Sequence, residues 1–212
     1  MRDSAAAPDE GAAPFLPPRS TLADLDRAAQ ACRGCDLWVR ATQTVFGEGS
    51  PGADLFLIGE APGDHEDREG HPFIGPAGRI LDQGLAMAGI DRGRTYVTNA
   101  VKHFKWEERG KRRIHQRPSR WEVVACGPWL AAELDAVQPR VVVLMGAVAG
   151  SAVMGPDFRV TRERGRVLEG PDGRPTVATV HPSSILRGRP DDRERALRAF
   201  ADDLAVAAGA AA

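Results

Sequence analysis

Carboxylates and a histidine stand in two short segments that each follow an apolar run of the chain. The first reads Gly-Glu-Ala-Pro-Gly-Asp over residues 59–64, and the second reads Val-His-Pro-Ser-Ser over residues 180–184. A carboxylate can act as a base or stabilise a developing cation, and an imidazole can donate or accept a proton. Ligands of open α/β sheets bind at the carboxyl ends of the strands. The two segments therefore predict a reaction site centred on Glu60 and His181.

Each of the two segments also has a simpler interpretation. The carboxylates that follow the first strand, Glu60, Asp64, Glu66 and Asp67, could form an ordinary acidic surface loop. The second segment could be a helix start with Ser183 or Ser184 as the N-cap, because serine is a preferred capping residue. A capping role and a catalytic role for this segment are compatible.

A third candidate segment, residues 102–117, is strongly basic. It carries seven basic and two acidic side chains, with Phe104 and Trp106 among them, in a chain whose formal net charge is −1. Positive charge interleaved with aromatic rings suits single-stranded nucleic acid, which needs phosphate neutralisation and base stacking. A solvated loop is the alternative. The segment ends in His115, and the neighbouring Lys and Arg favour its neutral, nucleophilic form.

The cysteines suggest a metal centre. Cys32 and Cys35 form a C-x-x-C sequence, which in a reducing compartment indicates metal ligation or redox chemistry. Cys126 is a candidate third ligand and His103 the best fourth. Three thiolates and an imidazole could hold an iron–sulfur cluster or a tetrahedral zinc ion. The alternative is one buried free cysteine plus an incidental C-x-x-C.

Apolar runs that alternate with helical patterns position these residues. Strands are predicted at 54–59, 95–101, 140–146 and 176–180, and helices at 20–31, 76–89, 118–137 and 191–208. Residues 60–75 and 102–117 are predicted as loops, and residues 159–173 as a hairpin or an exposed loop. Strands that are apolar throughout favour a parallel sheet covered on both faces. We predict a three-layer α/β/α sandwich around a mainly four-stranded parallel sheet.

Length and composition favour one globular domain. The chain has 212 residues, 42% of them hydrophobic and 27% charged. Residues 1–18 hold four prolines and five alanines without a period, so we predict a disordered tail there and a single domain over 19–212. Because no apolar run is long enough to cross a bilayer or to form a signal peptide, we expect a cytoplasmic protein without membrane partners, and we expect a monomer.

Taken together, these residues resemble the iron–sulfur branches of the uracil-DNA glycosylase superfamily. Gly59-Glu60-Ala61-Pro62-Gly63, with Gly70-His71-Pro72-Phe73-Ile74-Gly75-Pro76-Ala77-Gly78, is similar to the uracil-pocket motif of the family 4 enzymes. Asn99 stands where that family has its base-reading asparagine, and His181-Pro182-Ser183-Ser184 resembles its histidine motif. Lys111-Arg112-Arg113-Ile114-His115 is similar to the insertion that marks the UdgX branch.

The resemblance implies a role for each matching residue. It implies a [4Fe–4S] cluster on Cys32, Cys35, His103 and Cys126, and uracil-containing DNA, preferentially single-stranded, as the partner. The remaining implied residues are the catalytic Glu60, Asp67, His115 and His181; the uracil-binding Ala61, Gly63, Asp64, Phe73, Asn99 and His181; and the DNA-binding Lys102, Lys111, Arg112, Arg113, Ser183, Ser184 and Arg187.

The UdgX-like segment implies an unusual outcome. In that branch the histidine at the position of His115 becomes attached to the sugar after uracil leaves, which would consume the enzyme in one turnover. Ala61 departs from the branch, which usually has glutamine there, and agrees with ordinary family 4 enzymes. A conventional glycosylase with repeated turnover is therefore one alternative, and a non-catalytic iron–sulfur protein that binds single-stranded DNA is another.

Overall fold

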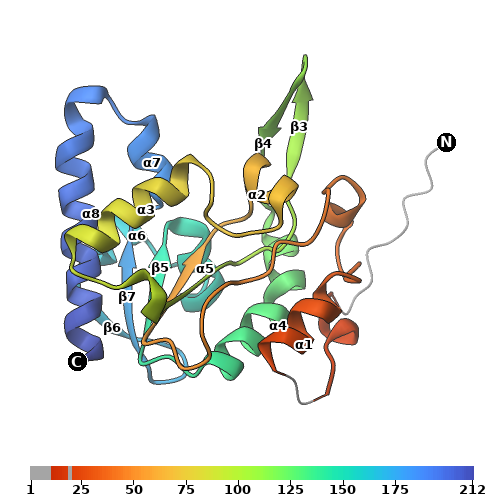
Figure 1. Ribbon diagram of the computed structural model, residues 1–212, viewed down its shortest axis with the longest axis horizontal. Coiled ribbons are helices and arrows are strands. Elements are labelled where there is room, and N and C mark those ends of the chain that lie inside the picture. The colour runs from red at the N-terminus through yellow and green to blue at the C-terminus, as the bar shows by residue number, and fades with distance from the viewer. Residues whose placement is uncertain (1–10, 19–20) are drawn as a thin grey trace.

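The computed structural model describes residues 11–18 and 21–212. Within these residues, five strands form one sheet in the order β2-β1-β5-β7-β6 (Figure 1). They are β1 (Leu55–Gly59), β2 (Thr95–Asn99), β5 (Val141–Met145), β6 (Val167–Glu169) and β7 (Pro175–Thr179). The first four in this order run parallel, and β6 pairs antiparallel with β7. The predicted mainly parallel α/β sheet is confirmed.

Alternate residues of each strand fill two hydrophobic cores, because successive side chains point to opposite faces of a sheet. Leu55 and Leu57 of β1 belong to the core that also contains Phe200 of the C-terminal helix. Phe56 and Ile58 belong to the core on the other face. Because each face of the sheet packs against a core, the strands are apolar throughout. This is the pattern from which the three-layer arrangement was predicted.

Helices cover both faces of the sheet (Figure 1). One layer contains α3 (Pro76–Met87), α7 (Pro182–Arg187) and α8 (Pro190–Ala211), and the other contains α4 (Arg120–Val137) and α5 (Ala147–Met154). The helix α1 (Leu22–Ala29) lies against α4. Its N-terminus is closed by a capping box between Thr21 and Asp24.

Three segments differ from the sequence predictions. Residues 60–75 contain the helix α2 (Asp64–Glu69), and residues 102–117 contain an antiparallel hairpin of β3 (Trp106–Arg109) and β4 (Arg112–His115) rather than a loop. Residues 159–173 form the short helix α6 (Val160–Glu163) and then β6, which makes a hairpin with β7. The residues of α2 and of the β3–β4 hairpin are mostly polar, so they lack the hydrophobic period that predicts helices and strands.

The predicted disordered tail is wrong for residues 11–18. Ala13–Phe15 form a short 3-10 helix, η1, and the Ala12 N–H donates to the Ala125 carbonyl at 2.8 Å. Ala12 is buried in the same hydrophobic cluster as the three cysteines. The rest of the predicted tail, residues 1–10, lies outside the described residues.

Within the described parts of the chain, every helix is too short or too polar to cross a bilayer.

Candidate active site

A cavity of about 740 Å³ opens at the carboxyl ends of the parallel strands. The chain leaves β1 toward β2 on one side and returns through α4 to β5 on the other, so the strand order reverses beside β1. Such a switch point is where open α/β sheets bind ligands. Eleven predicted site residues line the cavity: Glu60, Ala61, Gly63, Asp64, Phe73, Asn99, His115, His181, Ser183, Ser184 and Arg187.

One wall of the cavity is built by Asn99 and Phe73. Asn99 ends β2 beside Gly59, and its Oδ1 atom is buried without a hydrogen-bond partner among the described residues. An unpaired buried polar atom costs about 1–3 kcal/mol, which a ligand with a matching donor would recover. A Cβ atom on Gly59 would lie 2.4 Å from this Oδ1 and 2.5 Å from the Phe73 ring. Glycine at this position lets both side chains approach the strand end.

Phe73 is held in place by an uncommon backbone conformation. Its φ angle is +57°, which is rare for a residue with a bulky side chain. A Cβ atom on Gly78 would lie 1.6 Å from the Phe73 carbonyl oxygen. The close contact between α3 and this turn therefore requires glycine at residue 78, and it directs the Phe73 ring into the cavity.

His181 is fixed in one neutral tautomer. It is the N-cap of α7, and its Nδ1 accepts the Ser183 N–H at 3.2 Å and lies 2.8 Å from Ser183 Oγ. The Arg187 guanidinium donates to the same Oγ at 3.0 Å, which leaves the hydroxyl proton for Nδ1. Burial, with Arg187 and His115 nearby, lowers the pKa of His181 to about 4. The proton of the neutral ring therefore resides on Nε2.

This arrangement corrects the predicted helix cap. The N-cap of α7 is His181 itself, and neither Ser183 nor Ser184 takes that position. Ser183 instead orients the imidazole, and Ser184 donates from Oγ to the His181 carbonyl at 2.7 Å.

Glu60 lines the cavity together with Arg117 and Arg187. Burial raises the pKa of its carboxyl group, while Arg117 and Arg187 act in the opposite direction. A partly desolvated carboxylate is well suited to stabilise a nearby cation, because its charge is weakly screened there.

Glu66 braces the loops around the cavity, a role that sequence reasoning missed. Its buried carboxylate accepts the Gly63 N–H at 3.1 Å and the Gly75 N–H at 2.8 Å. It thereby joins the N-terminus of α2 to the N-terminus of α3. Glu three residues after Gly63 has the spacing of a capping box, a signal that could have identified the helix and the brace.

His115 reaches the cavity at the end of the β3–β4 hairpin. Its ring lies 6.0 Å from the Phe104 ring, measured between centroids. Loss of hydration lowers the pKa of His115, and Arg187 adds to this effect while Glu66 opposes it. His115 is therefore neutral at physiological pH and has a free lone pair at the cavity mouth.

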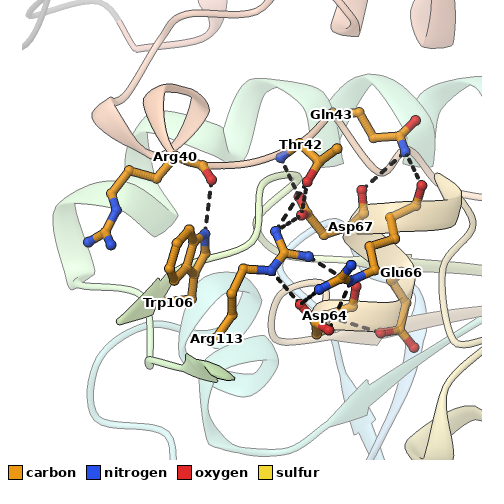
Figure 2. Close-up of polar contacts among 10 residues, drawn as sticks. Arg40, Thr42, Gln43, Asp64, Glu66, Asp67, Trp106 and Arg113 are labelled. Atoms are coloured by element: carbon orange, nitrogen blue, oxygen red, sulfur yellow. Dashed lines mark hydrogen bonds and ion pairs between the residues drawn. The ribbon is translucent and has the colours of Figure 1, made fainter. Parts of the chain in front are cut away.

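The hairpin is fastened to α2 by Arg113 (Figure 2). Its Nη1 atom lies 2.6 Å from Asp67 Oδ2, and its Nε lies 2.5 Å from Asp64 Oδ1. Asp67 is fully buried and also accepts both the backbone N–H and the hydroxyl group of Thr42. Trp106 adds a second attachment by donating from Nε1 to the Arg40 carbonyl at 2.9 Å.

These contacts change the roles predicted for three residues. Lys102 is fully buried, where its ammonium group pairs with Glu133 and donates to the Asn99 carbonyl, so it has no surface with which to contact DNA. Asp67 does not line the cavity, and its carboxylate forms an ion pair with Arg113. The Arg113 guanidinium, which was expected to contact DNA, pairs with Asp64 and Asp67 of the protein itself. Lys111 and Arg112 lie exposed at the hairpin tip, outside the cavity.

The three cysteines lie together in a buried hydrophobic cluster. All three are free, and burial raises the pKa of Cys35 to about 11 and that of Cys126 to about 12. Cys126 Sγ accepts the Lys102 N–H at 3.3 Å, and Cys32 Sγ accepts the Trp129 indole N–H at 3.2 Å. Among the described residues, no group of three or more histidine, cysteine or acidic side chains is arranged to hold a single metal ion.

His103 is also buried, and its ring orientation follows from its neighbour. The Thr44 hydroxyl donates to the Ala29 carbonyl at 2.9 Å, so its oxygen accepts from His103 Nε2, 3.0 Å away. Burial lowers the pKa of His103 to about 4, which keeps the ring neutral. The lone pair on Nδ1 is therefore free to ligate a metal.

The fold and the cavity define an α/β protein of the doubly wound type with a ligand site at its switch point. Residues 46–205 match the family described as "Uracil DNA glycosylase superfamily", and the chain belongs to this superfamily. It is 35% identical over 165 residues to the type-4 uracil-DNA glycosylase of Thermotoga maritima, covering 77% of this chain and 82% of that protein. It is also 35% identical over 182 residues to the type-4 enzyme of Archaeoglobus fulgidus, covering 82% and 87%.

Proposed function

We propose that this protein excises uracil from DNA and is then captured on the sugar through His115. The observation that carries the first part is the unpaired Asn99 Oδ1, buried in the wall of a cavity that Phe73 and His181 share. The names of the relatives, which are uracil-DNA glycosylases, support the same substrate. The proposed substrate is preferentially single-stranded, because a base flips from a single strand at lower cost.

The side chains of the wall match the edges of uracil. An asparagine amide offers one acceptor and one donor, which is what the N3–H and O4 groups of uracil require. Phe73 would stack on the face of the base. The Nε2–H group of neutral His181 would donate to the uracil carbonyl on which negative charge develops as the glycosidic bond breaks.

Bond cleavage sends the electron pair of the C1′–N1 bond to uracil and leaves a cationic sugar. The Glu60 carboxylate would stabilise this cation, since burial keeps the carboxylate weakly screened. The raised pKa of Glu60 also suits it to accept a proton afterwards.

In this proposal His115 would complete the reaction. The lone pair of its neutral ring would attack C1′, form a C–N bond, and leave an imidazolium whose N–H proton passes to Glu60 and from there to the uracil anion. The resulting bond joins an imidazole to the sugar and has no activated leaving group. One turnover would therefore consume one protein molecule, a form of nucleophilic catalysis by histidine.

A conventional glycosylase is the second candidate, and Ala61 favours it. Ala61 lines the cavity next to Glu60 and presents only a methyl group, so it cannot direct the nucleophile by a hydrogen bond. Water would then attack C1′, and His115 would contact DNA without reacting.

We further propose that Cys32, Cys35, Cys126 and His103 hold a [4Fe–4S] cluster. The residues fit, because all four are buried and the sulfurs of Cys32 and Cys126 accept N–H groups, as the sulfurs of such clusters do. His103 donates from Nε2 to Thr44, an outer-shell contact of the kind that orients ligating histidines. The cluster would be structural and would join the α1 side of the protein to α4.

The test is an incubation with a labelled single-stranded oligonucleotide that contains one uracil, followed by boiling in detergent and a denaturing gel. We expect a retarded band and one equivalent of free uracil per protein molecule. The band should disappear in His115→Ala and in a strand with thymine in place of uracil. His71→Ala is the matched control, because His71 is exposed, pairs with Glu48 and does not line the cavity.

Other results would select the alternatives. Multiple equivalents of free uracil without a retarded band would establish the conventional glycosylase. Strand binding without release of uracil would leave a non-catalytic DNA-binding protein.

A further inference from the structure

A second groove, of about 930 Å³, runs beside the cavity between α4 and α5. It is lined largely by valines and alanines, among them Val123 and Val148, and by Leu130 and Phe158. Val124 on its rim is 67% exposed, which is unusual for a residue of this type. Nothing in the proposed reaction uses this groove.

The groove continues directly from the proposed reaction site. Arg117, Ala147 and Val160 line both hollows. Arg117 also lies near enough to Glu60 to affect its pKa. A strand that delivers one nucleotide to the cavity would therefore have its next nucleotides at the entrance to the groove.

The charge of the groove fits a polyanion. Its lining includes Arg117, Arg120 and Arg159 and contains no acidic residue. Within the described residues, Arg117 and Arg120 form no ion pair, and Arg159 donates only to the Pro156 and Phe158 carbonyls. Arginines that are not neutralised by carboxylates, above an apolar floor, suit phosphates and unstacked bases.

We propose that this groove binds the single-stranded DNA that flanks the flipped nucleotide on one side, with its bases on the apolar floor and its phosphates on Arg120 and Arg159. The proposal rests on the proposed function for the identity of the strand. It predicts that affinity depends on the length of DNA on one side of the uracil and not equally on both sides.

The experiment measures fluorescence anisotropy with four labelled oligonucleotides: a trinucleotide with a central uracil, extensions on the 5′ side or the 3′ side alone, and an extension on both sides. A Glu60→Gln background prevents turnover. We expect one of the two single extensions to strengthen binding. The double variant Arg120→Ala/Arg159→Ala should weaken that complex about tenfold and reduce its salt slope by about 1.4, since each phosphate contact on a single strand contributes about 0.7.

The matched control is Arg195→Ala/Arg198→Ala, which removes the same charge from exposed positions on α8. Val124→Glu tests whether the strand passes the rim of the groove, because an exposed position tolerates glutamate while the new charge repels the strand. Binding of the trinucleotide should change in none of these variants. Arg117 is left intact because it also lines the reaction cavity.

Two results would overturn the proposal that this groove binds DNA. One is equal affinity of all extended strands for the double variant and the parent protein, and the other is equal weakening by the α8 control. Failure of the proposed function would look different, since uracil would then not be released by the protein with Glu60 intact. The binding comparison would still decide whether the groove holds DNA.

Discussion

Replacing Arg113 with alanine would separate the docking of the hairpin from binding of the base. Arg113 does not line the cavity, yet its guanidinium joins the strand that carries His115 to Asp64 and Asp67 of α2. Asp67 is 0% exposed, so removal of its cationic partner leaves a buried charge without compensation. Such a loss typically costs about 3–5 kcal/mol.

The structure places this cost at the lower end of the range. Asp67 keeps the N–H group and the hydroxyl group of Thr42 as donors, and Asp64 keeps Arg68. We therefore expect about 3 kcal/mol, which for a chain of this length lowers the melting temperature by about 6–12 °C. The two-stranded hairpin, which is marginal by itself, should detach before the rest of the protein unfolds.

Two assays follow this change. Thermal unfolding gives the stability, and a single-turnover reaction gives the ratio of protein–DNA adduct to free uracil. We expect that ratio to fall about 100-fold in Arg113→Ala, because 3 kcal/mol corresponds to roughly two powers of ten, while uracil release falls much less. Arg112→Ala, one residue earlier on the same strand and exposed, should behave as the parent protein.

A double-mutant cycle sharpens the test, because it isolates the pair interaction. In an Asp67→Asn background the buried charge is absent, so Arg113→Ala should cost little additional stability. An unchanged adduct ratio and melting temperature in Arg113→Ala would refute the reasoning. It would mean that Trp106 and its contact with Arg40 hold the hairpin without Arg113.

Four further predictions concern the cavity and the cysteines. Asn99→Ala should reduce the second-order rate constant of uracil release in a single-turnover reaction by about 100-fold, consistent with loss of a bidentate contact of about 3 kcal/mol, without lowering the melting temperature. Gly78→Ala should lower the melting temperature and weaken uracil binding together, because its Cβ atom would collide with the Phe73 carbonyl. The adduct yield should fall only in buffer more acidic than the usual pKa of an imidazole, since the pKa of His115 is lowered and protonation removes its lone pair; loss of yield already at pH 7 would contradict this. Cys126→Ser should abolish the broad visible absorbance expected of an iron–sulfur protein and reduce bound iron measured by mass spectrometry, and a colourless parent protein containing one zinc ion would contradict the cluster.

Much of the fold could be predicted because it depends on apolar patterns. The runs at 55–58 and 141–145 are buried on both faces, and such runs indicate central strands without knowledge of their partners. The hairpin could not be found in this way, because Trp106–Arg109 and Arg112–His115 carry mostly charged side chains. Their pairing is stabilised by contacts with α2 and Arg40, which lie far away in the sequence.

The candidate site, like the fold, could be predicted only in part. Residues at or just after the ends of strands, such as Asn99 and His181, line one cavity because the carboxyl ends of parallel strands share one edge. Lys102 was misassigned to DNA because its partner, Glu133, is distant in sequence. A signal was present, since Glu133 interrupts the apolar face of α4 and a buried carboxylate requires a cation or donors.

The sheet and the hairpin contribute different parts of the site, and this separation bears on how such proteins evolve. The cavity walls come from the ends of β1, β2, β5 and β7, whereas His115 belongs to a separate two-stranded sheet attached through a few side chains. A lineage could therefore gain or lose the proposed nucleophile by inserting or deleting one surface segment, without rebuilding the walls of the cavity. For engineering, grafting the hairpin with aspartates at the positions of Asp64 and Asp67 onto a related scaffold is the minimal transplant that this architecture permits.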